Sequence, residues 1–292
     1  MTEELNQFEM KKIDKPLYSS TQALNLCIKS KESRIANADL VNRLKLVRHT
    51  VSDEEIYYIE KADEQSLFSV ETQEDIDGVV TIDEMKNLYE KTFVRSKYPR
   101  KIYNSIISSP DHGTCPYCFQ RKVSTIDHYL PKDNFPVFAI SPINLLPSCP
   151  VCNTKKSNYK TDVATNQLIH PYFDETNDGR WLYADVIEIK PIVIIFKTNC
   201  PEEWPVIKRK RIENHFDFLK LGELYSCHSG SEIAGMSFKL EQAFAGGGAH
   251  GVRLRLSEDA ESWFKYHKNC WQAAMYEALS LSEWFCSGGF AE

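Results

Sequence analysis

Two Cys-x-x-Cys pairs constrain this chain more than any other feature of its sequence. The first pair is Cys115 and Cys118, and the second is Cys149 and Cys152. Two such turns can present four thiolates to one tetrahedral Zn²⁺, and metal binding of this kind contributes to the folding energy of a small module. The 30 residues between the pairs exceed the spacing of simple zinc fingers and ribbons, so we expect further structure there. The alternative is four buried free cysteines, which do not usually come as two such pairs.

The remaining sequence predicts a cytoplasmic protein. The chain of 292 residues has nine cysteines, an odd number that suits metal binding in a reducing compartment better than a disulfide framework. Its first residues are polar and acidic, unlike a signal peptide, and no apolar run reaches the roughly 18 residues that a membrane span needs. The other five cysteines lie among apolar residues and are expected to be buried: Cys27, Cys200, Cys227, Cys270 and Cys286.

Positive charge is concentrated in the segment that carries the cysteine pairs. Residues 95–160 contain 10 Lys and Arg against 3 Asp and Glu, whereas the whole chain has a net charge of −6. Residues 1–94 contain 12 Lys and Arg against 19 Asp and Glu, and residues 161–292 contain 13 Lys and Arg against 19 Asp and Glu. A local positive field of this kind is typical of a protein that binds a phosphate backbone. Chance clustering in a short window is the alternative.

Periodicity predicts an α+β chain that is mainly helical. We expect three parts: an acidic helical N-terminal extension (1–94), a zinc-supported central module (95–165), and a strand pair followed by a helical extension (166–292). Helical spacing is found over residues 21–47, 81–92, 211–226 and 260–284, and strand patterns over 181–189 and 192–196. Thr81 and Glu84 have the spacing of a capping box. The glycine-rich segment 245–251 lacks the Lys-Ser/Thr of a phosphate-binding loop and is predicted to be a flexible connector.

A second motif lies between and just after the cysteine pairs. Asp127 and His128 follow a short β-branched run, Asn144 comes 16 residues after His128, and Asn153 comes 9 residues after Asn144. Asn153 lies on a polar helix that is expected to begin near Pro150. Each of these residues alone has an ordinary structural explanation, as a strand-end cap, a buried histidine or a helix cap. Their order and spacing between two zinc-binding turns point to a functional site.

This pattern, over about residues 112–160, resembles the zinc-supported HNH nucleases, whose core is a ββα-metal module. The resemblance implies that His128 is the general base and that the Asn144 side-chain oxygen orients its ring. It also implies that Asp127 and Asn153 bind a catalytic Mg²⁺ or Mn²⁺. The third family position is often histidine, so an asparagine there is a departure that bears on metal preference.

Three lysines are candidates for contacts with the nucleic-acid backbone: Lys132, Lys155 and Lys156. Lys156 lies one helical turn after Asn153. The expected substrate is DNA, with RNA as an alternative. His170 follows the motif and is expected to brace the site rather than to take part in catalysis.

The chain also resembles stand-alone HNH proteins of bacterial antiphage systems of the Septu-like and retron-associated kinds. That resemblance implies an ABC-type ATPase as partner. Two further hypotheses remain open: the chain is a zinc-supported nucleic-acid-binding module without catalysis, or it is an adaptor for the ATPase.

Overall fold

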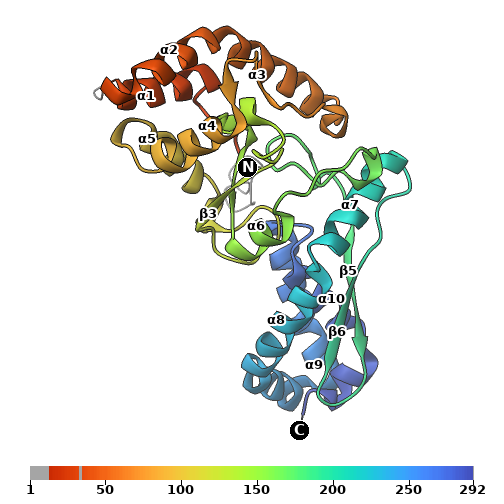
Figure 1. Ribbon diagram of the computed structural model, residues 1–292. Helices are drawn as coiled ribbons and strands as arrows, with labels where there is room; N and C mark the ends of the chain where they lie inside the picture. Colours follow the sequence, from red (N-terminus) through yellow and green to blue (C-terminus); the bar gives the residue numbers. More distant parts are fainter. Residues whose placement is uncertain (1–12, 33–34, 292) are drawn as a thin grey trace, which may run out of the picture. The chain divides into compact units, whose positions relative to one another are not determined.

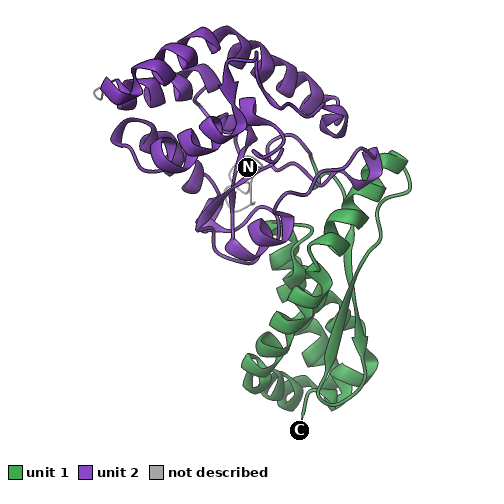
Figure 2. Ribbon diagram, viewed as in Figure 1, with its two compact units in different colours: residues 1–11, 175–292 green, residues 12–174 purple. Residues whose placement is uncertain are grey.

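The computed structural model describes residues 13–32 and 35–291, which form two compact units (Figure 2). The division falls between Asp174 and Glu175: the first unit is the part before it (purple, labelled unit 2 in Figure 2), and the second unit is the part from Glu175 onward (green, labelled unit 1). The N-terminal helices and the cysteine-bearing segment belong to one unit. Within the described residues, every helix is too short or too polar to cross a membrane.

The first unit begins with the helices α1 (Ser20–Lys31), α2 (Ala38–Leu46) and α3 (Arg48–Asp63) (Figure 1). The helical pattern over residues 21–47 is thus confirmed. Ser19 and Gln22 form a capping box that satisfies backbone N–H groups at the start of α1. The apolar side of α1, including Leu24 and Ile28, is buried. Burial of such a stripe supplies most of the stability of a short helix.

A short hairpin and three more helical segments follow. The hairpin pairs β1 (Asp75–Ile76) with β2 (Val80–Thr81). Helix α4 (Ile82–Asn87) then starts at the capping box predicted from Thr81 and Glu84, which the structure confirms. It continues into the π-helix η4 (Leu88–Phe93), and α5 (Lys97–Ile107) completes this part. Glu84 also accepts from the Arg43 guanidinium, which ties α4 to α2.

The central segment consists of two antiparallel strands and a helix. β3 (Thr125–His128) pairs with β4 (Leu145–Ser148), so that Asp127 lies opposite Leu146 and His128 opposite Leu145. Helix α6 (Pro150–Lys156) follows directly and packs against β3. A proline suits the first turn of a helix because its missing N–H would have no partner there. The order of strand, strand and helix agrees with the order expected from the sequence.

Over its described residues, the second unit contains a hairpin, four α-helices and the π-helix η9 (Phe285–Gly289). β5 (Leu182–Ile187) pairs with β6 (Val193–Thr198), which confirms the predicted strand pair. α7 (Val206–Phe218) and α8 (Leu221–Gly235) replace the single helix expected over 211–226, because Lys220 has a left-handed conformation with φ 53°. α9 (Ser237–Tyr266) and α10 (Trp271–Leu281) likewise replace the single helix expected over 260–284. α10 packs on β5 and α8 on β6.

The glycine-rich segment 245–251 joins two helical halves of α9 at Gly248, which is not helical itself, so the segment is a connector as predicted, but its other residues are helical rather than a flexible loop. α9 passes through it with a kink at Gly248, where φ is 58° and ψ is −149°. Gly251 lies where the two halves of α9 approach each other, and a Cβ there would come within 2.4 Å of the Ala243 carbonyl oxygen. The glycines therefore allow a bend in the helix, and Gly251 is required by the close backbone approach.

The bend in α9 gives a prediction about two glycines of the same helix. Gly251→Ala should lower the free energy of unfolding by about 1–3 kcal/mol, because the new methyl group overlaps the Ala243 carbonyl. Gly246→Ala is the matched control: a Cβ there meets nothing within 4 Å, so it should be neutral or stabilise by up to about 1 kcal/mol. Thermal and urea unfolding would measure both, and equal stabilities would contradict the prediction.

Candidate functional site

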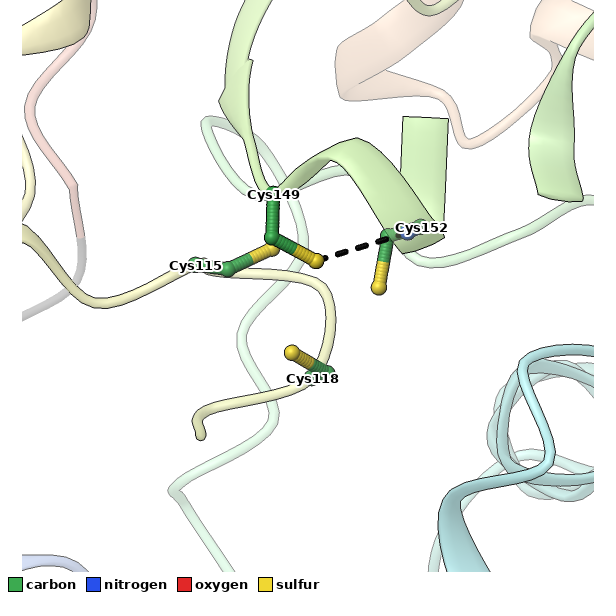
Figure 3. A group of neighbouring side chains, drawn as sticks. All are labelled: Cys115, Cys118, Cys149 and Cys152. Atoms are coloured by element: carbon green, nitrogen blue, oxygen red, sulfur yellow. Dashed lines mark hydrogen bonds between the residues drawn. The ribbon is translucent and has the colours of Figure 1, made fainter. Parts of the chain in front are cut away.

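The four cysteines of the two pairs come together in one buried cluster (Figure 3). Cys115 and Cys118 lie in the turn that precedes β3, while Cys149 and Cys152 lie at the start of α6. Their sulfur atoms are all within 4.8 Å of one another. A tetrahedral Zn²⁺ with bonds of about 2.3 Å places its sulfur ligands about 3.8 Å apart, so the cluster can hold a zinc ion after small adjustments.

The electrostatics of the cluster also fit a cation. Hydrogen bonds from neighbouring thiols lower the pKa of Cys118 to about 7 and lower that of Cys149 as well. The same neighbours raise the pKa values of Cys115 and Cys152. Four thiolates at this spacing repel one another unless a positive charge lies between them. A divalent ion would supply that charge and allow all four to ionise.

The cysteine cluster is linked directly to the predicted catalytic residues through Tyr117. This side chain lies between Cys115 and Cys118 and is buried. Its hydroxyl donates a hydrogen bond of 2.8 Å to Asp127 Oδ2. The sequence signal for this role is an aromatic residue with a polar tip inside a zinc-binding turn, and Tyr117 was not among the predicted site residues.

An open pocket of about 400 Å³ lies beside the ends of β3 and α6. Asp127, His128, Asn153 and Lys132 all line it, so the structure brings four of the predicted residues together. The rest of its lining is Tyr89, Ile126, Pro131, Thr154, Ser157 and Asn158.

His128 is held in one orientation and in the neutral state. Its Nε2 lies 2.8 Å from the Ala139 carbonyl oxygen. A carbonyl oxygen only accepts, so Nε2 carries the proton and Nδ1 keeps its lone pair. The Tyr89 ring packs edge-on at 4.4 Å between centroids. Burial lowers the pKa of His128 to about 3, so the imidazole is neutral at physiological pH.

Asn144 has a different role from the one that the resemblance implied. Its Oδ1 accepts from the Leu130 N–H at 2.7 Å, and its Nδ2 donates to the carbonyls of Leu130 at 3.0 Å and Phe138 at 3.3 Å. The His128 ring is instead oriented by the carbonyl of Ala139. Asn144 therefore acts on His128 indirectly. Its hydrogen bonds hold the buried loop at Leu130 and Phe138, and the residue after Phe138, Ala139, contacts the His128 ring.

A hydrogen-bonded chain extends from Asn144 to His170. His170 Nδ1 accepts from the Tyr172 N–H at 3.2 Å, so the neutral ring carries its proton on Nε2. That Nε2 lies 3.0 Å from the Tyr58 hydroxyl, which in turn donates to Asn144 Oδ1 at 3.2 Å. Tyr58 belongs to α3, far away in the sequence, and nothing in the sequence marked it. The geometry agrees with the expected bracing role of His170.

Asp127 and Asn153 approach the pocket from β3 and α6. Asp127 is 2% exposed, and its Oδ2 lies 3.1 Å from Lys156 Nζ in addition to the Tyr117 contact. Burial raises the pKa of Asp127, and the nearby ammonium opposes this shift. Asn153 Nδ2 donates to the Ile126 carbonyl at 3.3 Å, which leaves its Oδ1 without a hydrogen-bond partner among the described residues. Carboxylate and amide oxygens are ligands that hard divalent cations prefer.

The three predicted backbone-binding lysines lie in different environments. Lys132 lines the pocket, and its Nζ is 3.1 Å from Glu90 Oε1. Lys155 is half-buried on α6. Lys156 is only 3% exposed and is paired with Asp127, so the structure does not place it where the expected phosphate contact would be made. Lys156 lies in the last turn of α6, and its long side chain is buried. The helical spacing from Asn153 did not predict this burial.

The chain is similar in sequence to two known proteins. It is 29% identical to protein Ea31 of Escherichia phage lambda over 225 residues, which cover 72% of this chain and 76% of that protein. It is 38% identical to the Septu protein PtuB of Bacillus thuringiensis over 68 residues, or 22% of this chain and 26% of PtuB. The chain thus matches about a quarter of the length of PtuB. No protein-family model matches the chain, and no solved structure matches it.

The cysteine cluster predicts a stability that depends on zinc. Cys149→Ser should reduce bound zinc from about one ion per chain to a small fraction, and should destabilise the first unit by several kcal/mol, since metal binding contributes to folding. Cys227→Ser is the control and should leave both properties unchanged, because Cys227 of the second unit is exposed, and the expectation that it is buried was wrong. Elemental analysis and thermal unfolding would measure the effect. Equal zinc content in the two variants would argue against the site.

The Tyr58 network predicts a measurable contribution of one buried hydroxyl. Tyr58→Phe should lower the free energy of unfolding by about 1–3 kcal/mol, because Asn144 and His170 each lose a buried partner. Tyr57→Phe removes the hydroxyl of the neighbouring, exposed tyrosine and should change stability by less than about 0.5 kcal/mol. Urea unfolding would separate the two. A neutral Tyr58→Phe would show that the network carries no net stability.

Proposed function

We propose that this protein is a metal-dependent nuclease of the HNH type that hydrolyses DNA phosphodiester bonds. The observation that carries the proposal is the state of His128. Its Nε2–H is held by the Ala139 carbonyl, and its Nδ1 has no hydrogen-bond partner among the described residues. The ring is neutral and lines the same pocket as Asp127 and Asn153. This arrangement supports a general base beside a site for a divalent cation.

The proposed chemistry follows from these groups. His128 Nδ1 takes a proton from a water molecule as that water attacks the scissile phosphate. The Ala139 carbonyl stabilises the imidazolium that forms, because it accepts from Nε2–H throughout. Asp127 and Asn153 would hold Mg²⁺ or Mn²⁺ through oxygen ligands. When bound, such an ion supplies Lewis-acid stabilisation of the phosphate and of the leaving oxygen.

The charge distribution supports a nucleic-acid substrate. The positive segment 95–160 contains every residue that lines the pocket apart from Tyr89, and Lys132 is one of them. Lys132 and Lys155 are therefore the proposed contacts to the phosphate backbone. Such contacts position a duplex without reading its sequence.

We further propose a role in antiphage defence. The similarity to PtuB, whose name identifies it as a Septu protein, supports this role over the 68 residues that match. The resemblance to Septu-like systems supports an ABC-type ATPase as partner.

One observation favours a second candidate function. Asp127 already has an internal cation as partner, because Lys156 Nζ lies 3.1 Å from its Oδ2. A carboxylate that is neutralised in this way suits a zinc-supported nucleic-acid-binding module, or an adaptor for the ATPase, that has no catalysis of its own. Direct measurement of cleavage separates the two functions.

The zinc-loaded protein is expected to nick or linearise supercoiled plasmid with Mg²⁺ or Mn²⁺ and to be inactive in EDTA. His128→Ala should reduce the rate by at least about 100-fold, because it removes the base. His49→Ala is the control, since His49 lies on the surface of α3, and it should cut at the wild-type rate.

Two outcomes would contradict the proposal in different ways. Cleavage that survives in His128→Ala would show that another group is the base. A folded, zinc-bound wild type that shifts the plasmid in a gel but does not cut it, alone or with the ATPase partner, would favour the binding module.

A further inference from the structure

The buried ammonium of Lys156 is paired with polar groups that lie beside the pocket. Besides Asp127 Oδ2 at 3.1 Å, Nζ lies 2.5 Å from the His128 carbonyl oxygen, to which it donates. Lys156 and Asp127 are 3% and 2% exposed, respectively. Lysine and aspartate are rarely buried to this degree unless they are paired, so each charge depends on the other.

This pairing places two cations in competition for one carboxylate. Asp127 is the proposed ligand of the catalytic divalent ion, and its Oδ2 is occupied by Lys156 and by the Tyr117 hydroxyl. Charges in a buried site interact strongly, because water does not screen them. A divalent ion bound to Asp127 would therefore be repelled by an ammonium about 3 Å from the same oxygen.

The structure also has room for the ammonium to move. A small cavity of about 30 Å³ is lined by Lys156 together with Tyr129, Tyr159 and Gln167. This volume is enough to admit a group of the size of a water molecule. The Tyr129 ring lies 5.7 Å from Nζ, and an aromatic face is a favourable neighbour for a cation. A shift of Nζ into this cavity, which is partly open to solvent, would free Asp127.

We infer that Lys156 is an internal counter-ion of Asp127 that competes with the divalent cation and thereby lowers the metal affinity of the pocket. In the metal-free protein it neutralises the buried carboxylate and ties the last turn of α6 to the end of β3. Metal binding displaces it from Asp127 toward the cavity. The inference rests on the proposed function, because it takes Asp127 as a metal ligand.

Binding of Mn²⁺ to the zinc-loaded full chain tests this inference without reference to cleavage. Mn²⁺ would be titrated by electron paramagnetic resonance into the wild type, Lys156→Met and Lys155→Met. Lys156→Met should bind Mn²⁺ at least about ten-fold more tightly, because the competing charge is gone. Lys155→Met removes the same charge from the adjacent position of α6, outside the ion pair, and should change the affinity by less than about two-fold.

Further variants show whether the gain passes through Asp127 and whether folding intervenes. The double variant Asp127→Asn with Lys156→Met contains neither buried charge and should lose the tight Mn²⁺ binding. Where Lys156→Met does not fold, Lys156→Gln decides the question by the same comparison, because its side chain is polar but carries no charge.

The outcomes separate this inference from the proposed function. Equal Mn²⁺ affinity in the wild type and Lys156→Met, both lost on Asp127→Asn, would overturn the counter-ion role and leave the metal site intact. No Mn²⁺ binding by any folded variant would overturn the proposed catalytic metal site, and the inference with it. If Lys155→Met also bound Mn²⁺ more tightly, the gain would come from the loss of any nearby positive charge, and the inference would be overturned.

Discussion

The convergence of four cysteine sulfurs is the constraint on which the rest of the site depends. The two strands and the helix beside it have only four, four and seven residues, too few to be stable by themselves. The cluster joins the turn before β3 to the start of α6, and so fixes both ends of this small module. Through Tyr117 it also reaches the carboxylate of Asp127, so that the module and the pocket share one support.

The buried loop between β3 and β4 gives the pocket its chemical character. A buried loop must satisfy its backbone groups, and Asn144 does so for Leu130 and Phe138. The loop then presents the Ala139 carbonyl to His128, which fixes the tautomer of the ring. The protein thus orients its candidate base with a backbone group, and the side chains behind that group come from distant parts of the first unit.

Local signals allowed much of this structure to be predicted, and non-local contacts account for what was missed. The cysteine pairs, the capping box at Thr81 and the alternating strands are recorded in neighbouring residues, and the structure contains all of them. The burial of Lys156 depends on β3 packing against α6, which no spacing encodes. The conformation of the glycine-rich segment depends on the close approach of the two halves of α9 at Gly251. In both cases tertiary packing overrides local propensity.

Under the proposed function, the hydrogen bond from Tyr117 to Asp127 would make the second metal site depend on the first. Tyr117 reaches the carboxylate only when the turn between Cys115 and Cys118 is formed, and that turn is part of the cysteine cluster. Under the proposed function, zinc must therefore be acquired before the second metal can find a shaped site. A newly made chain would stay unable to damage the genome of its own cell until its first metal had been delivered.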